Sequence, residues 1–166
     1  ILIEKNTIND HVRTATGTVI GIVSYGHNAR IDQNYLKNVY ASAGSNGDAE
    51  SGIYSKALAG SISNNTIINA GRGNGCIVWK GGFESSCISS NTILMSDSTY
   101  NAFVGIRAYT ANCVIEGNVL NGDGASINTA ILLGDSNEDR QSPVNIDIVA
   151  NVIANCIYET TTGRAI

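Results

Sequence analysis

The chain has 166 residues, which is the usual length of one domain. Its formal net charge of −4 argues against a nucleic acid partner, because phosphate recognition needs a basic surface. The 18 Gly, the single Pro and the scarcity of strong helix formers argue against helices. No apolar run is long enough to cross a membrane.

One hexapeptide pattern occurs six times: Ile, two variable residues, Asn, one variable residue, then Ile or Leu. The copies are IEKNTI, IDQNYL, ISNNTI, ISSNTI, IEGNVL and IVANVI. Their asparagines are Asn6, Asn34, Asn65, Asn91, Asn118 and Asn151. Successive asparagines are 28, 31, 26, 27 and 33 residues apart. Such a period is typical of stacked repeat architectures.

Each hexapeptide is interpreted as two short strands that meet at a corner. Its apolar residues are five positions apart, which one uninterrupted strand of period two does not allow. Asn tolerates the left-handed backbone conformation that a sharp bend demands, so we expect the asparagine itself to hold the corner.

A third strand is expected upstream of most corners, and it begins with a Gly-Ile signal. The segments are GIVSY from Gly21, GIYSK from Gly52, CIVWK from Cys76, GIRAY from Gly105 and, more loosely, AILL from Ala130. Three strands per coil predict about six coils along the chain.

A coil of this length with three strands and an Asn corner resembles the right-handed parallel β-helix of pectate lyases and phage tailspikes, the pectin lyase-like superfamily. The resemblance covers nearly the whole chain and implies an all-β solenoid with an Asn ladder, as one domain over residues 1–166. An antiparallel sandwich is the alternative, but it does not explain a hexapeptide kept in phase six times. The chain begins inside a repeat without Met, and Gly163 to Ile166 resemble the opening of another strand. We therefore expect a fragment of a longer β-helix protein.

Two apolar columns are expected to fill the interior. The first contains Ile3, Ile31, Ile62, Ile88, Ile115 and Ile148. The second contains Ile8, Leu36, Ile67, Ile93, Leu120 and Ile153. The four cysteines have no metal-type spacing and are interpreted as free thiols that pack in the core.

The outward side chains of the Gly-Ile strands form the candidate functional surface. One expected outward column reads Val23, Tyr54, Val78 and Arg107, and the next reads Tyr25, Lys56, Lys80 and Tyr109. A register shifted by one residue in the third coil would instead bring Trp79 beside Lys56. Aromatic rings stack on sugars, while Lys and Arg bind carboxylates. The surface therefore predicts binding of an extended, possibly acidic polysaccharide, with substrate-binding residues Tyr25, Tyr54, Trp79, Lys80 and Tyr109. The alternative is that these are ordinary exposed strand residues.

Residues 46–57, NGDAESGIYSKA, resemble the active-site coil of the alginate lyase and chondroitin B lyase family. The resemblance implies that Asp48 and Glu50 bind Ca²⁺ or substrate and that Lys56 is the general base. Arg107, a neighbouring cation, completes the predicted catalytic group. The chain departs from the family in two ways: Lys56 follows Glu50 by six residues instead of five, and Lys80-Gly81 stands where the family has an Arg-His pair.

Phage tailspikes suggest a different chemistry for the same surface. They mostly hydrolyse polysaccharides with two carboxylates, about 5 to 5.5 Å apart for retention or 6.5 to 9.5 Å for inversion. Candidate pairs are Asp48 with Glu50, either of these with Asp123, or Glu4 with Asp32.

The sequence therefore favours an enzyme, a tailspike-like depolymerase that binds and cleaves a polysaccharide. The alternatives are a Ca²⁺-dependent uronate lyase and a non-catalytic shaft or adhesin. Calcium is the one cofactor considered, and the tailspike resemblance implies a homotrimer located outside the cell or on a virion surface.

Overall fold

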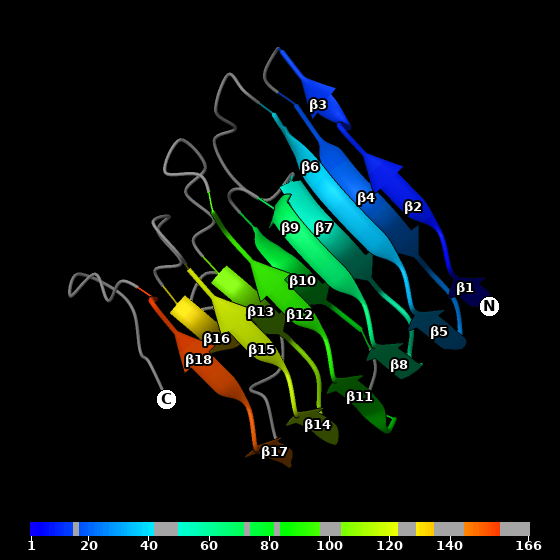
Figure 1. The fold of residues 1–166 in the computed structure, drawn as a ribbon. Helices are drawn as coiled ribbons and strands as arrows, with labels where there is room; N and C mark the ends of the chain where they lie inside the picture. The colour runs from blue at the N-terminus through cyan, green and yellow to red at the C-terminus, as the bar shows by residue number, and fades with distance from the viewer. Residues whose placement is uncertain are drawn as a thin grey trace.

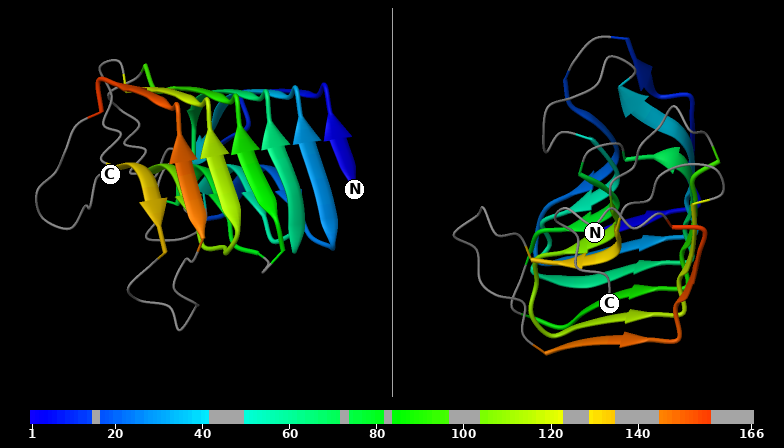
Figure 2. Two further views of the ribbon diagram at one scale, coloured as in Figure 1. Left: turned by 90° about the horizontal axis from the view of Figure 1, so that it is seen from below. Right: turned by 90° about the vertical axis from the view of Figure 1, so that its left-hand side faces the viewer.

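The computed structural model describes residues 1–14, 17–41, 50–71, 74–81, 84–96, 104–122, 129–134 and 145–156. Within these ranges the chain forms 18 strands in three parallel sheets. None of the described segments is a helix that could cross a membrane. Successive coils stack from the N-terminal to the C-terminal end (Figures 1 and 2). The predicted all-β parallel solenoid with an Asn ladder is confirmed.

Each sheet collects one strand from successive coils. The first sheet contains the strands that precede the asparagine corners: β1 (Leu2–Glu4), β5 (Asn28–Asp32), β8 (Ala59–Ser63), β11 (Ser86–Ser89), β14 (Cys113–Glu116) and β17 (Ile146–Val149). The second sheet contains the strands that follow the corners: β2 (Thr7–Asn9), β6 (Tyr35–Ala41), β9 (Thr66–Ala70), β12 (Thr92–Leu94), β15 (Val119–Asn121) and β18 (Val152–Ala154), with β3 (Val12–Arg13) beside β6. The third sheet contains β4 (Val19–Ser24), β7 (Glu50–Ser55), β10 (Gly75–Trp79), β13 (Val104–Ala108) and β16 (Thr129–Leu133).

The expected number of about six three-stranded coils is slightly too high. The third sheet has five described strands, and the chain passes from β4 to β16 in four complete turns. In the first coil, the described strands belong only to the first and second sheets. Six corners therefore do not mean six complete coils.

Both predicted interior columns are confirmed by the strand register. The first runs from Ile3 to Ile148, with each isoleucine paired to its equivalent in the next coil. The second runs in the same way from Ile8 to Ile153. The members in the middle coils are fully buried, because each one is covered by the coils on both sides. Stability is then a sum of nearest-neighbour contacts along the stack.

The asparagine ladder is continuous from Asn6 to Asn151. The side-chain Nδ2 of each asparagine donates to Oδ1 of the next one, at 2.9 to 3.0 Å. The backbone N–H of each donates to the same oxygen. All of these bonds point the same way along the axis, so the ladder has a direction.

The predicted position of the left-handed residue at each corner is wrong by one residue. None of the six ladder asparagines has a positive φ, whereas the residue before each one does, with φ between 54° and 59°. These residues are Lys5, Gln33, Asn64, Ser90, Gly117 and Ala150, and all of them are exposed. The exposed residue makes the bend, which leaves the following asparagine free to direct its amide along the axis.

Packing against the second interior column explains why most of the Gly-Ile strands begin with glycine. A Cβ atom on Gly21 would lie 2.5 Å from Cδ2 of Leu36, and one on Gly105 would lie 2.5 Å from Cδ2 of Leu120. These leucines belong to the second interior column and occupy the space that a side chain would need. The third sheet therefore carries small residues at this position in every coil.

The cysteines of the described residues are free. Burial raises the pKa of the Cys76 thiol to about 12 and that of the Cys113 thiol to about 11. Thiols with such values are poor nucleophiles at neutral pH. The prediction that cysteines serve as core residues is confirmed for these two, while Cys87 and Cys156 are only partly buried.

Candidate functional site

The residues of the two expected outward columns lie in register on the third sheet, but Val78 is fully buried. Val23, Tyr54, Val78 and Arg107 pair in register across β4, β7, β10 and β13. The next row follows from the backbone hydrogen bonds that Lys56, Lys80 and Tyr109 donate to the preceding strand, at 2.7 to 2.8 Å. We define the aromatic–cationic face by six residues of these rows: Tyr25, Tyr54, Lys56, Lys80, Arg107 and Tyr109.

One half of the aromatic–cationic face is open to solvent. Lys56 Nζ lies 5.9 Å from the ring centre of Tyr25 and 5.7 Å from that of Tyr54. The Tyr25 side chain is 57% exposed, and Lys56 is also exposed. Cation–π attraction holds the ammonium group beside two rings, at distances typical of such pairs. A ligand can therefore meet a positive charge and an aromatic surface at one place.

The other half is more closely packed. Lys80 Nζ lies 4.9 Å from the ring centre of Tyr109, and the guanidinium carbon of Arg107 lies 5.9 Å from it. Arg107 Nη1 also donates to Tyr109 Oη and to Asn74 Oδ1, each at 3.0 Å. Tyr109 is only 9% exposed, so its ring orients the two cations more than it offers a stacking surface.

Asn74 is a residue of this site that the sequence analysis missed. It is fully buried, and its side-chain oxygen fixes the Arg107 guanidinium. Asn74 lies just before β10, in a glycine-rich segment whose sequence contains no sign of the contact.

Trp79 does not lie on the aromatic–cationic face. It pairs with Ser55, is fully buried, and donates its indole N–H to the Ala57 carbonyl oxygen at 3.1 Å. The shifted register that places it beside Lys56 is therefore wrong. The ring fits inside because the neighbouring coil has only a serine at the paired position, and because a backbone carbonyl satisfies the indole donor.

The predicted calcium ligands do not form a site within the described residues. Glu50 is fully buried at the start of β7, where Oε2 accepts from the Ala41 N–H at 3.2 Å. Its Oε1 has no hydrogen-bond partner among the described residues. Asp48 lies outside the described residues, as does Asp123. Over the described part of the chain, no group of three or more His, Cys, Asp or Glu could hold a metal ion.

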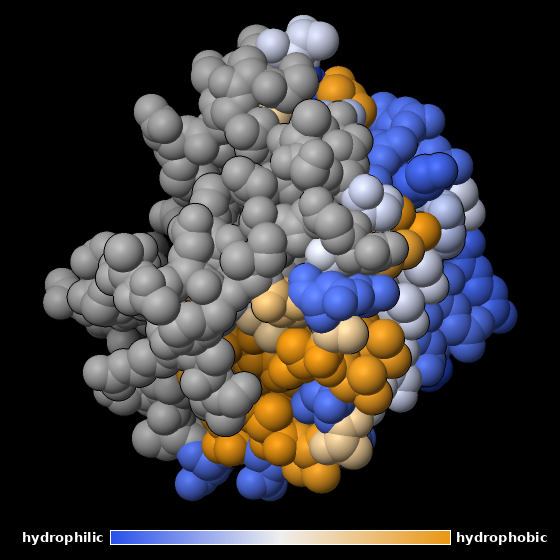
Figure 3. All heavy atoms as spheres, turned by 60° about the vertical axis from the view of Figure 1, so that its left-hand side comes forward, coloured by the Kyte–Doolittle hydropathy of each residue, from blue (hydrophilic) through white to orange (hydrophobic). Residues whose placement is uncertain are grey.

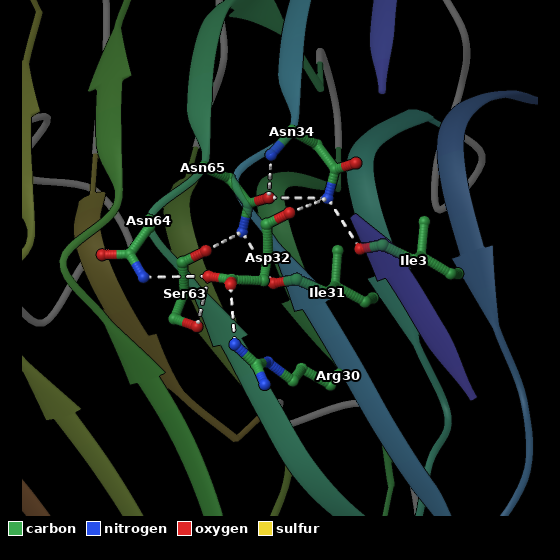
Figure 4. A network of polar contacts seen from close by, with 8 residues as sticks. All are labelled: Ile3, Arg30, Ile31, Asp32, Asn34, Ser63, Asn64 and Asn65. Atoms are coloured by element: carbon green, nitrogen blue, oxygen red, sulfur yellow. Dashed lines mark hydrogen bonds and ion pairs between the residues drawn. The ribbon is translucent and has the colours of Figure 1, made fainter. Parts of the chain in front are cut away.

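The remaining candidate carboxylate pair, Glu4 with Asp32, lies on the first sheet. The two residues are neighbours in register on β1 and β5. Asp32 is buried and accepts hydrogen bonds from Asn64, Arg30 and Ser63 at 2.8 to 3.1 Å (Figure 4). The hydrogen bond from Asn64 is the main cause of a lowered pKa for Asp32. A carboxylate held in this way is part of the structure and does not readily donate a proton.

The first and third sheets differ in their balance of charges. The described strands of the third sheet and the residue after each one carry three cations, Lys56, Lys80 and Arg107, and one carboxylate, the buried Glu50. Counted in the same way, the first sheet carries four carboxylates, Glu4, Asp32, Glu116 and Asp147, and two cations, Lys5 and Arg30, of which Arg30 is paired with Asp32. The aromatic–cationic face is thus positive, although the whole chain has a negative net charge.

Comparison with known proteins places the chain in no family. No protein-family model, no curated protein and no solved structure matches it.

Proposed function

We propose that the aromatic–cationic face binds an extended, acidic polysaccharide. The observation that carries this proposal is Lys56, which is exposed between the rings of Tyr25 and Tyr54 on a face without an exposed described carboxylate. A tyrosine ring covers the apolar face of a sugar, and an ammonium group pairs with a uronate carboxylate. Polymers of this kind occur on cell surfaces, so a location outside the cell or on a virion belongs to the same proposal.

The regularity of the sheet supports a polymeric ligand. Equivalent residues of successive coils are separated by the distance between paired strands, roughly 4.8 Å. The row that begins with Tyr25, Lys56 and Lys80 therefore repeats binding groups along the solenoid axis, and Tyr109 at its end orients Lys80. A chain molecule lying along that axis meets several of these groups at once.

Cleavage of the bound polymer is the second candidate function. A glycoside hydrolase needs two carboxylates at the scissile bond, whereas a uronate lyase needs a base for the C5 proton. Among the described residues, the aromatic–cationic face offers the exposed Lys56 but no carboxylate pair. For a lyase, we propose that the unprotonated form of Lys56 takes the C5 proton as the C4–O bond to the leaving sugar breaks, and that water protonates the released oxygen. Lys80 and Arg107 would pair with the substrate carboxylate.

The binding proposal is tested by titrating the protein with a polyuronate and with a neutral polysaccharide. Lys56→Gln and Tyr25→Ala should each weaken polyuronate binding, for Lys56→Gln by about tenfold, equivalent to about 1.4 kcal/mol. The matched controls are Lys37→Gln and Tyr35→Ala on β6, which change the same residue types on the second sheet. Equal losses in the controls, or no binding of either polymer, would reject the proposal.

The cleavage proposal needs a separate readout. Incubation with the same polymers is followed by absorbance of unsaturated sugars and by reducing ends. Unsaturated product that disappears in Lys56→Ala but persists in Lys37→Ala supports a lyase. Reducing ends without unsaturated product indicate a hydrolase, and absence of both signals with intact binding leaves a binding protein.

A further inference from the structure

The aromatic–cationic face contains two clusters of rings and cations, each of which spans two neighbouring coils. The first, the Lys56 cluster, consists of Lys56, Tyr25 and Tyr54. Tyr25 directly follows β4, whereas Tyr54 belongs to β7. Lys56 Nζ is almost equally far from the two ring centres, at 5.9 Å and 5.7 Å. The positive charge of this cluster therefore lies between the coils of β4 and β7.

The second, the Lys80 cluster, lies further along the axis and consists of Lys80, Arg107 and Tyr109. Lys80 directly follows β10, and Tyr109 directly follows β13. The ring centre of Tyr109 is 4.9 Å from Lys80 Nζ and 5.9 Å from the guanidinium carbon of Arg107. The positive charge of this cluster therefore lies between the coils of β10 and β13.

Lys56 and Lys80 are neighbours in the backbone, but their ammonium groups are drawn apart. The Lys80 N–H donates to the Ser55 carbonyl oxygen at 2.7 Å, which places Lys80 beside Lys56 on the next coil. The rings of Tyr25 and Tyr109 flank this pair from opposite sides along the axis, so cation–π attraction pulls the two charges in opposite directions. The charges of the two clusters are thus about two strand spacings apart, roughly 10 Å.

The surface between the two clusters is uncharged in the described structure. In the row that contains Tyr54 and Arg107, the residue between them is Val78. It pairs with both and carries no charge. Along the axis, a ligand therefore meets a cation, a neutral interval and a second cationic position.

We propose that this face recognises a polysaccharide whose carboxylates point to the protein at every second sugar. A sugar ring in an extended chain is about as long as the spacing between paired strands, so two strand spacings correspond to two sugars. An alternating polymer of a uronate and a neutral sugar has this arrangement, and so does a polyuronate whose successive rings face opposite sides. The inference rests on the proposed polysaccharide binding and adds the spacing of the charges that are recognised.

Apolar surface on other sheets does not extend this face. Figure 3 shows such surface on the side of the molecule that carries the C-terminal coil. The exposed valines of the described C-terminal coils, Val119, Val149 and Val152, belong to the first and second sheets. The contacts of the aromatic–cationic face with a polymer therefore come from the Lys56 cluster and the Lys80 cluster.

The test compares short oligosaccharides of defined length, with affinities measured by calorimetry at low salt. A disaccharide of an alternating polymer carries one carboxylate, and its tetrasaccharide carries two, separated by one neutral sugar. The tetrasaccharide can reach both clusters at once and should bind at least about tenfold more tightly than the disaccharide. A disaccharide with carboxylates on adjacent sugars reaches only one cluster and should gain nothing comparable.

Substitutions show whether the two clusters supply this gain. Lys56→Gln and Lys80→Gln should each abolish the preference for the tetrasaccharide, and the double variant should lose little more, because either change alone prevents bridging. Lys37→Gln on β6 of the second sheet is the matched control and should keep the preference. Circular dichroism verifies that each variant is folded, and the length series with the wild type requires no variant.

Equal affinity for the alternating disaccharide and tetrasaccharide overturns the inference but leaves polysaccharide binding intact. The same holds if the disaccharide with adjacent carboxylates binds as tightly as the tetrasaccharide, because the charges are then read at one strand spacing. A preference that persists in Lys80→Gln places the second contact elsewhere and also overturns the inference. Failure of all the oligosaccharides and polymers to bind rejects both this inference and the proposed function.

Discussion

Each asparagine of the ladder is required for its hydrogen bonds and not for its backbone conformation. In the middle of the stack, Asn91 donates to Asn118 Oδ1 and to the Ile62 carbonyl oxygen, and its own Oδ1 accepts from Asn65. Asn91 is fully buried, so none of these groups can turn to water instead. A side chain without an amide leaves its neighbours in the ladder without partners.

Replacing a central ladder residue should therefore cost more than replacing a terminal one. We expect Asn91→Ala to lower the free energy of unfolding by about 2–4 kcal/mol, since it leaves buried donors and an acceptor unsatisfied. Asn6→Ala at the exposed end removes fewer bonds and should cost less. Urea unfolding of both variants measures the difference, and equal losses would show that the ladder does not stabilise the stack as described.

The stability of the fold should depend on the ionisation of Asp32. Its pKa is lowered in the folded protein, mainly by the hydrogen bond from Asn64 and also by Arg30 and Ser63. A lowered pKa stabilises the fold above the unfolded-state pKa, about 3.9, and this contribution is lost as the pH falls through the folded-state pKa.

The wild type should thus be more stable than Asp32→Asn near pH 6, and the difference should shrink below pH 4. Unfolding midpoints of both proteins across this range test the expectation. In an Asn64→Ala background the same comparison should depend less on pH. A difference that is constant with pH in the wild-type background would contradict the role given to Asp32.

At the level of the strands, the small residues of the third sheet determine how closely it approaches the second sheet. Gly105 does not have a positive φ, so glycine is needed there for space and not for a left-handed backbone. A Cβ atom there would lie 2.5 Å from Leu120 Cδ2 and 2.7 Å from the Ala130 carbonyl oxygen. Cys76, at the equivalent position of the preceding coil, shows that a small side chain can be accommodated in the interior, where its Sγ lies 3.9 Å from Met95 Sδ.

We expect Gly105→Ala to lower the free energy of unfolding by about 1–3 kcal/mol through overpacking. Cys76→Ala keeps a Cβ atom at the equivalent position and is the matched control, with an expected loss of about 1 kcal/mol. Chemical denaturation compares the two proteins. A Gly105→Ala variant as stable as the wild type would mean that the two sheets can separate at no cost.

The strands were predictable from the sequence because their residues repeat in phase. A column such as Ile62, Ile88 and Ile115 requires only that equivalent positions stack, and the hexapeptide defines these positions. The bend was assigned one residue too late, because the residues that adopt it, among them Gln33 and Ala150, share exposure but not residue type.

The candidate site was less predictable because it depends on side-chain contacts with the backbone of other segments of the chain. The alternation along β10 already predicts that Trp79 points inside, where it lies beside Ser55. The sequence alone does not reveal that the Ala57 carbonyl oxygen accepts the hydrogen bond of the indole N–H, which makes this burial favourable. Glu50 has the sequence context of a ligand, yet it is buried against the Ala41 amide. Such contacts join residues whose proximity no repeat pattern specifies.

Across the whole molecule, one face carries the proposed polysaccharide interaction. The aromatic–cationic face runs along the axis of the solenoid, across β4, β7, β10 and β13. The cations of this face belong to a chain of negative net charge, so the proposed attraction for an acidic polymer should depend on Lys56, Lys80 and Arg107 and not on the charge of the whole chain. Added salt should weaken that attraction, since exposed charges are screened over roughly 8–10 Å at ionic strengths near 0.1 M.

The decisive measurement is the affinity of the protein for a polyuronate at two salt concentrations, for the wild type and for the double variant Lys56→Gln, Lys80→Gln. We predict that the wild type binds, that its affinity falls as salt rises, and that the double variant binds at least about tenfold more weakly, a loss of about 1.4 kcal/mol. Equal affinity of the two proteins, or no binding by the wild type, would contradict a polysaccharide-binding role for the aromatic–cationic face.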